Sequence, residues 1–258
     1  MRYVLNIAYD GTDFHGWQKT PNQRTVQQAI ETALSRLMKR RTDVTGASRT
    51  DSGVHAYDQY AHFDSLKPLP RGMLLEGMNA LLPADARVKD VFSAPAAFSA
   101  RFSSLGKMYL YVISTLPVAM PILNRYSISV RKPLDVAAMK QACRVFVGRH
   151  DFSAFRAASC CARSPVKTID TCSLLCRSHN IYIVVQARSF MQYMVRNLAG
   201  AILYAGLGKL RADDISAIMA TRDLRQAPPT APAKGLFLVK MFYPAGRLKK
   251  LPLRETQV

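Results

Sequence analysis

Hydrophobic and polar residues alternate or recur in patterns that predict regular elements through the first half of the chain. Residues 2–9 alternate and are rich in apolar side chains until Asp10-Gly11 gives a turn signal, which predicts a first strand. Thr25 and Gln28 have the spacing of a capping box, and apolar residues follow at helical spacing to about Lys39, so a helix is predicted there. The same patterns predict strands at 43–47 and 57–63 and a short helix at 72–82.

The second half starts again with a strand and a helix. Residues 107–114 have the pattern of a strand, and Pro133 and Asp135 would begin a helix that Gly148 ends. The remaining patterns predict a hairpin of strands 166–176 and 181–189 turned at Ser178-His179-Asn180, helices at about 191–205 and 212–220, and a last strand at 236–243.

Both halves therefore begin strand, helix, strand, which indicates the α+β fold class. An internal duplication would explain this order, although no residue-level repeat establishes one. A chain of 258 residues, 49% of them hydrophobic, can form one large core or two packed subdomains. We expect an N-terminal subdomain at residues 1–104, a C-terminal subdomain at 105–245 and a mobile basic tail at 246–258.

The charge balance predicts a polyanionic partner. The chain has 36 Lys and Arg against 17 Asp and Glu, a formal net charge of +19. These basic residues are dispersed along the chain rather than gathered on one amphipathic helix, which favours nucleic acid over lipid headgroups. Phosphate contacts would then dominate the affinity, and binding should weaken steeply with salt.

The sequence contains no pattern typical of a membrane or exported protein. No hydrophobic run approaches the roughly 18 residues of a membrane span, and Arg2 leads directly into a strand-like run without a signal core or a cleavage site. Five cysteines, an odd number, argue against a disulfide framework. We therefore expect a cytoplasmic protein that is not bound to a membrane.

Metals and cofactors have little support in the sequence. One group of side chains could be interpreted as a metal site: Cys160, Cys161, Cys172, Cys176 and His179. A strand is the better interpretation, because the segment lacks paired Cys-x-x-Cys knuckles. The chain also has no glycine-rich phosphate loop, dinucleotide fingerprint or His-Glu-x-x-His helix, so we expect catalysis by side chains, with no metal and no cofactor.

The segment Gly46 to Ala56, reading GASRTDSGVHA, places an acid, bases and turn-forming residues within a short loop. Loops on rigid scaffolds often carry catalytic residues, and Asp51 is the candidate acid here. From the residues alone, ordinary turn chemistry explains Thr-Asp-Ser-Gly equally simply and is favoured. A serine hydrolase using Ser48, Asp51 and His55 is disfavoured, because triad members come from separate segments and no nucleophile elbow is present.

Seven short motifs occur along the chain in the order in which they occur in one protein family. They are TDFHGWQ (12–18), SRTDSGVHA (48–56), FSARFSS (98–104), KMYLY (107–111), HDFSAFRA (150–157), MVRN (194–197) and TAPAKGL (230–236). Together they resemble the tRNA pseudouridine synthase A (TruA) family from about Tyr3 to Tyr243. Six or more short motifs in register are far more specific than any one of them.

The resemblance implies a fold, an activity and partners. The fold would be two ferredoxin-like α/β subdomains whose antiparallel sheets join into one central sheet, with a basic active-site cleft between them. The activity would be isomerisation of uridine to pseudouridine at tRNA positions 38, 39 and 40, in the anticodon stem-loop, without metal or organic cofactor. The partners would be the anticodon arm of tRNA and a second copy of the chain in a homodimer. A non-catalytic RNA-binding protein or tRNA chaperone is the alternative that keeps the same basic surface.

The resemblance also implies roles for individual residues. Asp51 matches the catalytic aspartate, which attacks C1′ of the ribose, attacks C6 of the base or assists elimination; the sequence does not decide among these. Tyr109 matches an active-site tyrosine that can stack on uracil and remove the C5 proton. Arg49 matches an arginine that helps to flip the nucleotide out of its stack, and Arg196 a basic residue that pairs with the aspartate. Leu236 would form an apolar wall beneath the base, and the two arginines should keep Asp51 ionised.

Each of these residues also has a structural interpretation. Tyr109 could be a half-buried strand aromatic, Arg49 a phosphate contact and Arg196 a solvated helix residue. Trp17 of the first motif is expected to pack rather than to contact RNA.

The chain departs from the usual family pattern at a few positions. Ser48 stands where a glycine is usual, so the backbone there must tolerate a Cβ. Met108, Leu110 and Lys234 replace residues of different polarity. These differences concern RNA affinity and specificity more than the reaction.

Overall fold

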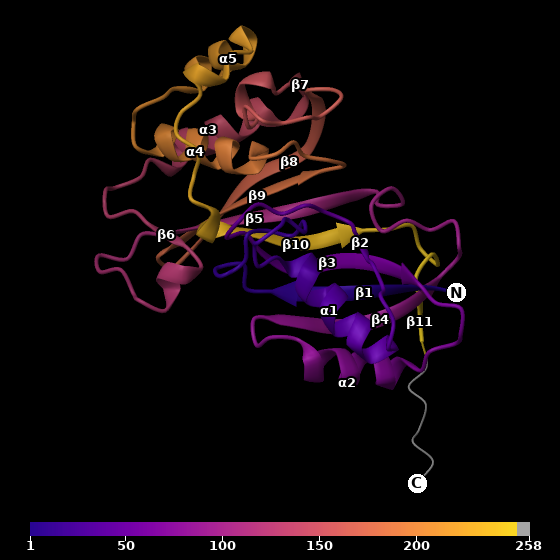
Figure 1. The fold of residues 1–258 in the computed structure, drawn as a ribbon. Helices are drawn as coiled ribbons and strands as arrows, with labels where there is room; N and C mark the ends of the chain where they lie inside the picture. The colour runs from indigo at the N-terminus through magenta and orange to yellow at the C-terminus, as the bar shows by residue number, and fades with distance from the viewer. Residues whose placement is uncertain (252–258) are drawn as a thin grey trace. The chain divides into compact units, whose positions relative to one another are not determined.

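The computed structural model describes residues 1–251 and divides into two compact units. The first contains Met1–Leu105 together with the described chain from Leu238 onward, and the second contains Gly106–Phe237. Each unit combines helices with strands that are mostly antiparallel, so the expected α+β class is confirmed (Figure 1). The strand β10 (Leu236–Phe242) crosses the boundary, with its first two residues in the second unit.

The first unit follows the order βαββαβ, which is that of a split βαβ motif. Its elements are β1 (Arg2–Tyr9), α1 (Val26–Met38), β2 (Thr45–Gly46), β3 (His55–Asp64), α2 (Arg71–Leu81) and β4 (Ala86–Ala94). The strands lie in the order β4-β1-β3-β2, each antiparallel to its neighbour, and β11 (Lys249–Lys250) pairs with β4. Strand β1 is paired on both edges, and its residues from Tyr3 to Ile7 are all buried.

Local signals explain where the first helix begins and ends. The Thr25 hydroxyl accepts a hydrogen bond from the N–H of Gln28 at 3.4 Å. Helix α1 starts directly after Thr25, as predicted. The helix ends where Lys39 adopts a left-handed conformation with φ of 49°. Its buried residues Val26, Ile30 and Leu34 face the interior at helical spacing, and α1 packs against α2.

Strand β4 is an element that the alternation of polar and apolar residues does not reveal. The pairing of β1 with β4 shifts register, since Asn6 lies opposite Asp90 but Ile7 lies opposite Val88. This irregularity leaves Lys89 between the paired positions, so Val88 and Val91 are both buried although they are three residues apart. Period-two alternation is lost at a bulge, and the strand is missed for that reason.

The second unit contains a four-stranded antiparallel arrangement covered by helices. Its main elements are β5 (Gly106–Ser114), β6 (Ile128–Ser129), α3 (Val136–Phe146), β7 (Gly148–Asp151), β8 (Val166–Arg177), β9 (Asn180–Ala187), α4 (Met194–Gly206) and α5 (Ala212–Thr221). The strands lie in the order β5-β9-β8-β7, and the short β6 runs parallel to β5. Helix α3 packs against α4, α5 and β8 (Figure 1).

Two sequence predictions for the second unit are confirmed with small shifts. The hairpin is β8–β9, turned by Ser178 and His179, and Ser178 has a φ of 52°. The carboxylate of Asp135 accepts the N–H of Ala138 at 2.9 Å and begins α3. This helix ends at Phe146 because Gly148 starts β7.

Phenylalanines of the HDFSAFRA motif form part of the second unit's core. Phe152 and Phe155 are completely buried, and both rings contact Phe146 of α3, with centroids 6.5 and 5.2 Å away. These two motif positions therefore contribute packing.

The basic tail predicted at 246–258 lies only partly within the described residues. Lys249 and Lys250 form β11, in register with Ser93 and Phe92 of β4. Residues 252–258, including Arg254, lie outside the described part of the chain. Within residues 1–251, no helix is both long enough and apolar enough to cross a membrane.

Candidate active site

The first unit brings the TDFHGWQ and SRTDSGVHA motifs into direct contact. The N–H of Trp17 donates to the carbonyl of Thr50 at 3.1 Å, and the N–H of Gly53 donates to the carbonyl of Phe14 at 3.2 Å. Gly16 has a φ of +79°, and a Cβ there would lie 2.6 Å from the Thr50 carbonyl oxygen. Only glycine allows this approach, so the first motif forms one wall of the Asp51 loop.

Gln59 of β3 holds the start of this loop through its side-chain amide. Its Oε1 accepts the N–H of Ser48 at 3.1 Å, and its Nε2 donates to the carbonyl of Ser48 at 2.7 Å. The same Nε2 lies 3.5 Å from the hydroxyl of Tyr9, which in turn is hydrogen-bonded to the hydroxyl of Thr50 at 2.7 Å. Gln59 is completely buried, so these bonds are formed away from water.

Exposure alternates along the residues that precede Asp51. Ser48 and Thr50 are buried, whereas Arg49 between them is exposed. Asp51 follows as a partly exposed residue, and its carbonyl accepts the N–H of Val54 at 3.2 Å to close the turn. The candidate arginine and the candidate aspartate are thus the two residues of this stretch that solvent can reach.

The arrangement of Ser48 and His55 disfavours the hydrolase interpretation. Both residues are buried, with 5% and 2% of their surface exposed, so a substrate carbonyl could not approach the serine. Nδ1 of His55 lies 3.0 Å from the N–H nitrogen of Gly11 and 3.1 Å from a carboxylate oxygen of Asp10. The φ of Ser48 is not positive, which explains why a residue with a Cβ fits where glycine is usual.

Trp17 packs inside the first unit, as expected. It is 2% exposed, and its ring centroid lies 6.3 Å from that of Tyr9. A Cβ on Gly46 would lie 2.3 Å from the indole, so this glycine makes room for the ring. The only tryptophan of the chain therefore supports the loop from beneath.

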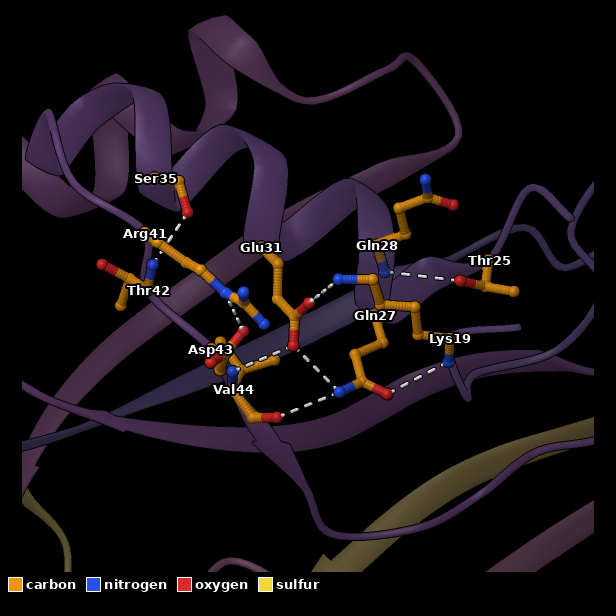
Figure 2. Close-up of polar contacts among 10 residues, drawn as sticks. All are labelled: Lys19, Thr25, Gln27, Gln28, Glu31, Ser35, Arg41, Thr42, Asp43 and Val44. Atoms are coloured by element: carbon orange, nitrogen blue, oxygen red, sulfur yellow. Dashed lines mark hydrogen bonds and ion pairs between the residues drawn. The ribbon is translucent and has the colours of Figure 1, made fainter. Parts of the chain in front are cut away.

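A second set of side chains holds the chain before the loop (Figure 2). Glu31 of α1 accepts the N–H of Val44 at 3.2 Å, and Gln27 donates to the carbonyl of Val44 at 3.2 Å and to Glu31 at 2.9 Å. Lys19 joins the group through its Nζ, 3.1 Å from the other Glu31 oxygen. Helix α1 therefore binds both main-chain groups of one residue in the segment that leads to Asp51.

In the second unit, Tyr109 lies on β5 opposite Val185 of β9. It is 6% exposed, and its ring meets that of Phe190 edge to face, with centroids 5.3 Å apart and planes at 84°. The geometry fits a ring held in one orientation by an aromatic neighbour.

Arg196 of α4 is bound to the segment before β10. Its Nε donates to the carbonyl of Ala231 at 2.8 Å, and its guanidinium lies 4.7 Å from the ring of Tyr193. Asn197, the next residue, accepts the hydroxyl of Thr230 at 2.6 Å. The MVRN and TAPAKGL motifs thus form one structural group.

Tyr111 and Gly235 complete this group. The Tyr111 hydroxyl donates to the carbonyl of Pro232 at 2.8 Å, and a Cβ on Gly235 would lie 2.8 Å from the Tyr111 ring. Burial raises the pKa of Tyr111, and the charge of Arg196 opposes this effect. Leu236, which follows directly, is 4% exposed, so it is a packed residue at the start of β10.

The predicted site residues are thus distributed over both units, with Arg49 and Asp51 in the first and Tyr109, Arg196 and Leu236 in the second. Gln59 was not predicted as part of a site. Its signal is a polar residue at an inward position of a strand, which needs buried hydrogen-bond partners.

The described residues 1–251 contain no cluster of three or more His, Cys, Asp and Glu side chains that could hold a metal ion. The thiols of the candidate metal group, those of Cys160, Cys161, Cys172 and Cys176, are all free, and Cys172 is the buried one.

Comparison with known proteins identifies the class to which this chain belongs. A family model described as tRNA pseudouridine synthase matches residues 6–103 and 142–244, so the chain belongs to the tRNA pseudouridine synthase family.

Curated relatives narrow this class to one type of enzyme. The chain is 43% identical over 240 residues to the tRNA pseudouridine synthase A of Ruminiclostridium cellulolyticum, covering 93% of this chain and 98% of the relative. It is 40% identical to the enzymes of that name from Syntrophotalea carbinolica, over 93% of this chain and 95% of the relative, and Myxococcus xanthus, over 97% and 95%. A chain of a solved Cbf5-Nop10-Gar1 complex is similar at 9% identity over 92% of this chain and 58% of that one, with a TM-score of 0.33, which supports no conclusion.

Proposed function

We propose that this chain isomerises uridine to pseudouridine at positions 38, 39 and 40 of tRNA, in the anticodon stem-loop. The observation that supports this most directly is about 40% identity to enzymes named tRNA pseudouridine synthase A over more than nine-tenths of the chain. The net charge of +19 suits a polyanionic substrate of this kind. Because the product has the same composition as the substrate, the reaction needs no redox partner or group donor.

In this proposal Asp51 is the nucleophile. The reaction breaks the bond between C1′ of the ribose and N1 of uracil and later joins C1′ to C5. A carboxylate suits this task, since positive charge develops at C1′ as the base leaves. The partial exposure of Asp51 in a turn held by buried bonds supports the role.

The other site residues then act on the same nucleotide. Arg49, the exposed residue two positions before Asp51, would hold the backbone open while the uridine leaves its stack. Tyr109 would stack on the uracil and remove the proton from C5, while N1 of the uracil gains a proton. Leu236 would contact the base from below. Arg196 would stabilise the ionised Asp51.

This mechanism requires that residues of the two units reach one nucleotide. We therefore propose two ferredoxin-like subdomains whose sheets join into one central sheet, with a basic cleft between them, and a homodimer that holds one tRNA. The βαββαβ order of the first unit and the family membership support this arrangement. Five free cysteines suit the reducing cytoplasm, where tRNA is modified.

The test is pseudouridine mapping on total tRNA from cells with and without this chain, and with its Asp51→Ala variant. We expect loss of pseudouridine at positions 38, 39 and 40 alone, restored by the wild type and not by Asp51→Ala. Asp43→Ala is the matched control, because this aspartate of the same segment is exposed and forms a surface pair with the exposed Arg41. A wild-type chain that makes no pseudouridine while it binds tRNA would support the RNA-binding alternative.

A further inference from the structure

We propose that Gln59 is a positioning residue for the catalytic loop, with Tyr9 as its second contact. The inference rests on the proposed role of Asp51 and extends it to two residues that do not touch the substrate. It follows from the hydrogen bonds that hold the loop on each side of Arg49.

Gln59 uses its whole side chain for this purpose. Its Oε1 accepts the N–H of Ser48 and of Tyr60, both at 3.1 Å, and its Nε2 donates to the carbonyl of Ser48 at 2.7 Å. A side-chain amide has an acceptor and a donor side by side, so it can accept from an N–H and donate to the C=O of the same residue. Gln59 therefore binds Ser48 as a neighbouring strand would, at the point where β2 has already ended.

Tyr9 extends this contact to the other side of Arg49. Its hydroxyl lies 3.5 Å from Nε2 of Gln59 and 2.7 Å from the hydroxyl of Thr50. The hydroxyl of Tyr9 can therefore accept from the amide of Gln59 and remain hydrogen-bonded to the hydroxyl of Thr50. The chain of contacts runs from Ser48 to Thr50 through two side chains of neighbouring strands.

The consequence concerns the two residues that solvent can reach. Ser48 and Thr50 are held from the inside, so Arg49 between them points outward and Asp51 begins its turn at a defined place. A shift of the loop by a fraction of an ångström would move the carboxylate relative to the nucleotide, and catalysis is sensitive to such shifts. Gln59 is completely buried, and water cannot replace the lost bonds without reorganising the core.

The Glu31 group provides a comparison within the same segment. Glu31 and Gln27 bind both main-chain groups of Val44 in the same manner, but seven residues before Asp51 (Figure 2). A loss there should lower stability without moving the catalytic residues. The two sites therefore separate a stabilising contact from a positioning one.

The experiment measures single-turnover pseudouridine formation with saturating enzyme, tRNA affinity and melting temperature for Gln59→Leu, Tyr9→Phe, Glu31→Gln and Asp51→Ala. For Gln59→Leu we expect the rate to fall about 100-fold, and for Tyr9→Phe between about twofold and tenfold. The tRNA dissociation constant of both should stay within about twofold of the wild type. Glu31→Gln removes the ion pair with Lys19, so its melting temperature should fall, and it should keep the wild-type rate.

The inference fails if Gln59→Leu and Tyr9→Phe, folded at the assay temperature, form pseudouridine at the wild-type rate. It also fails if Glu31→Gln slows the reaction as much as they do, because the effect would then follow stability. Tyr9→Phe decides the matter if Gln59→Leu does not fold, since it removes one hydroxyl and keeps the ring. Activity in Asp51→Ala would instead overturn the proposed function. If Asp51→Ala is inactive while the Gln59 and Tyr9 variants are fully active, this inference fails and the proposed function stands.

Discussion

Arg196 and Ala231 are joined by two hydrogen bonds: Nε of the arginine donates to the alanine carbonyl at 2.8 Å, and the alanine N–H donates to the arginine carbonyl at 3.2 Å. The guanidinium plane is therefore oriented by the main chain of a segment 35 residues away. This segment leads directly to Leu236, so the position of one candidate site residue depends on the other.

Arg196→Lys should reveal this dependence. Lysine keeps the positive charge but has no planar group with an Nε donor. The side-chain bond to the carbonyl of Ala231 and the fixed orientation of the charged group are therefore lost. We expect turnover to fall by about tenfold or more and stability by roughly 1 kcal/mol. Arg144→Lys on the exposed face of α3 is the control and should change neither quantity. Wild-type turnover in Arg196→Lys would mean that charge alone matters there.

Gly200 of α4 lies against the same segment and predicts a second measurable effect. A Cβ on Gly200 would lie 2.3 Å from the carbonyl oxygen of Pro229, which is a backbone atom and cannot turn aside. Gly200→Ala should therefore lower the free energy of unfolding by about 1–3 kcal/mol and displace the segment that Arg196 binds.

The matched control is Gly72→Ala in α2. A Cβ there meets only the end of Glu76, 3.9 Å away, and alanine favours the helix by about 0.5 kcal/mol. Thermal unfolding of the two variants should thus shift in opposite directions. Shifts of the same sign would contradict the close contact between α4 and Pro229.

These relationships indicate what the sequence could and could not predict. Strand β1, the caps at Thr25 and Asp135 and the β8–β9 hairpin depend on neighbouring residues, so the local pattern predicts them. Strand β4 was missed because a bulge breaks its alternation.

The surroundings of the candidate site could be predicted only in part. Motif order identified Asp51 and Arg196 as candidates, but not the buried partners that hold their segments. The contact of Thr50 with Trp17 and that of Ser48 with Gln59 join residues distant in sequence, and no periodicity encodes them. A glutamine at an inward position of a strand was the one available signal, and it does not identify its partner.

Ser48→Ala tests whether the residue that departs from the family pattern takes part in the chemistry. Gln59 binds the main chain of Ser48, and alanine keeps both bonds because they do not involve the hydroxyl. We expect turnover within about twofold of the wild type. Stability should fall by no more than about 1–2 kcal/mol, the cost of one buried hydroxyl's interaction. A loss of turnover by orders of magnitude would instead revive the hydrolase interpretation.

His62 of β3 makes the stability of the first unit dependent on pH. Burial, helped by the charge of Arg2, lowers the pKa of His62 below its usual value, and Asp64 opposes this only in part. Its Nδ1 accepts the N–H of Ala100 at 3.2 Å, a bond that protonation of Nδ1 would break. Both observations favour the neutral ring in the folded state.

The sign of the effect follows from proton binding. As pH falls below about 6.5, the unfolded chain protonates His62 while the folded chain does not, so the stability present above that pH is lost progressively. Carboxylates titrate mainly below this window. We expect the melting temperature to fall between about pH 7.5 and pH 5.5, and less so in His62→Asn, whose amide oxygen can still accept from Ala100. His15→Asn, at an exposed histidine of the same unit, should keep the wild-type slope. Equal slopes in all three proteins would show that His62 does not resist protonation in the folded state.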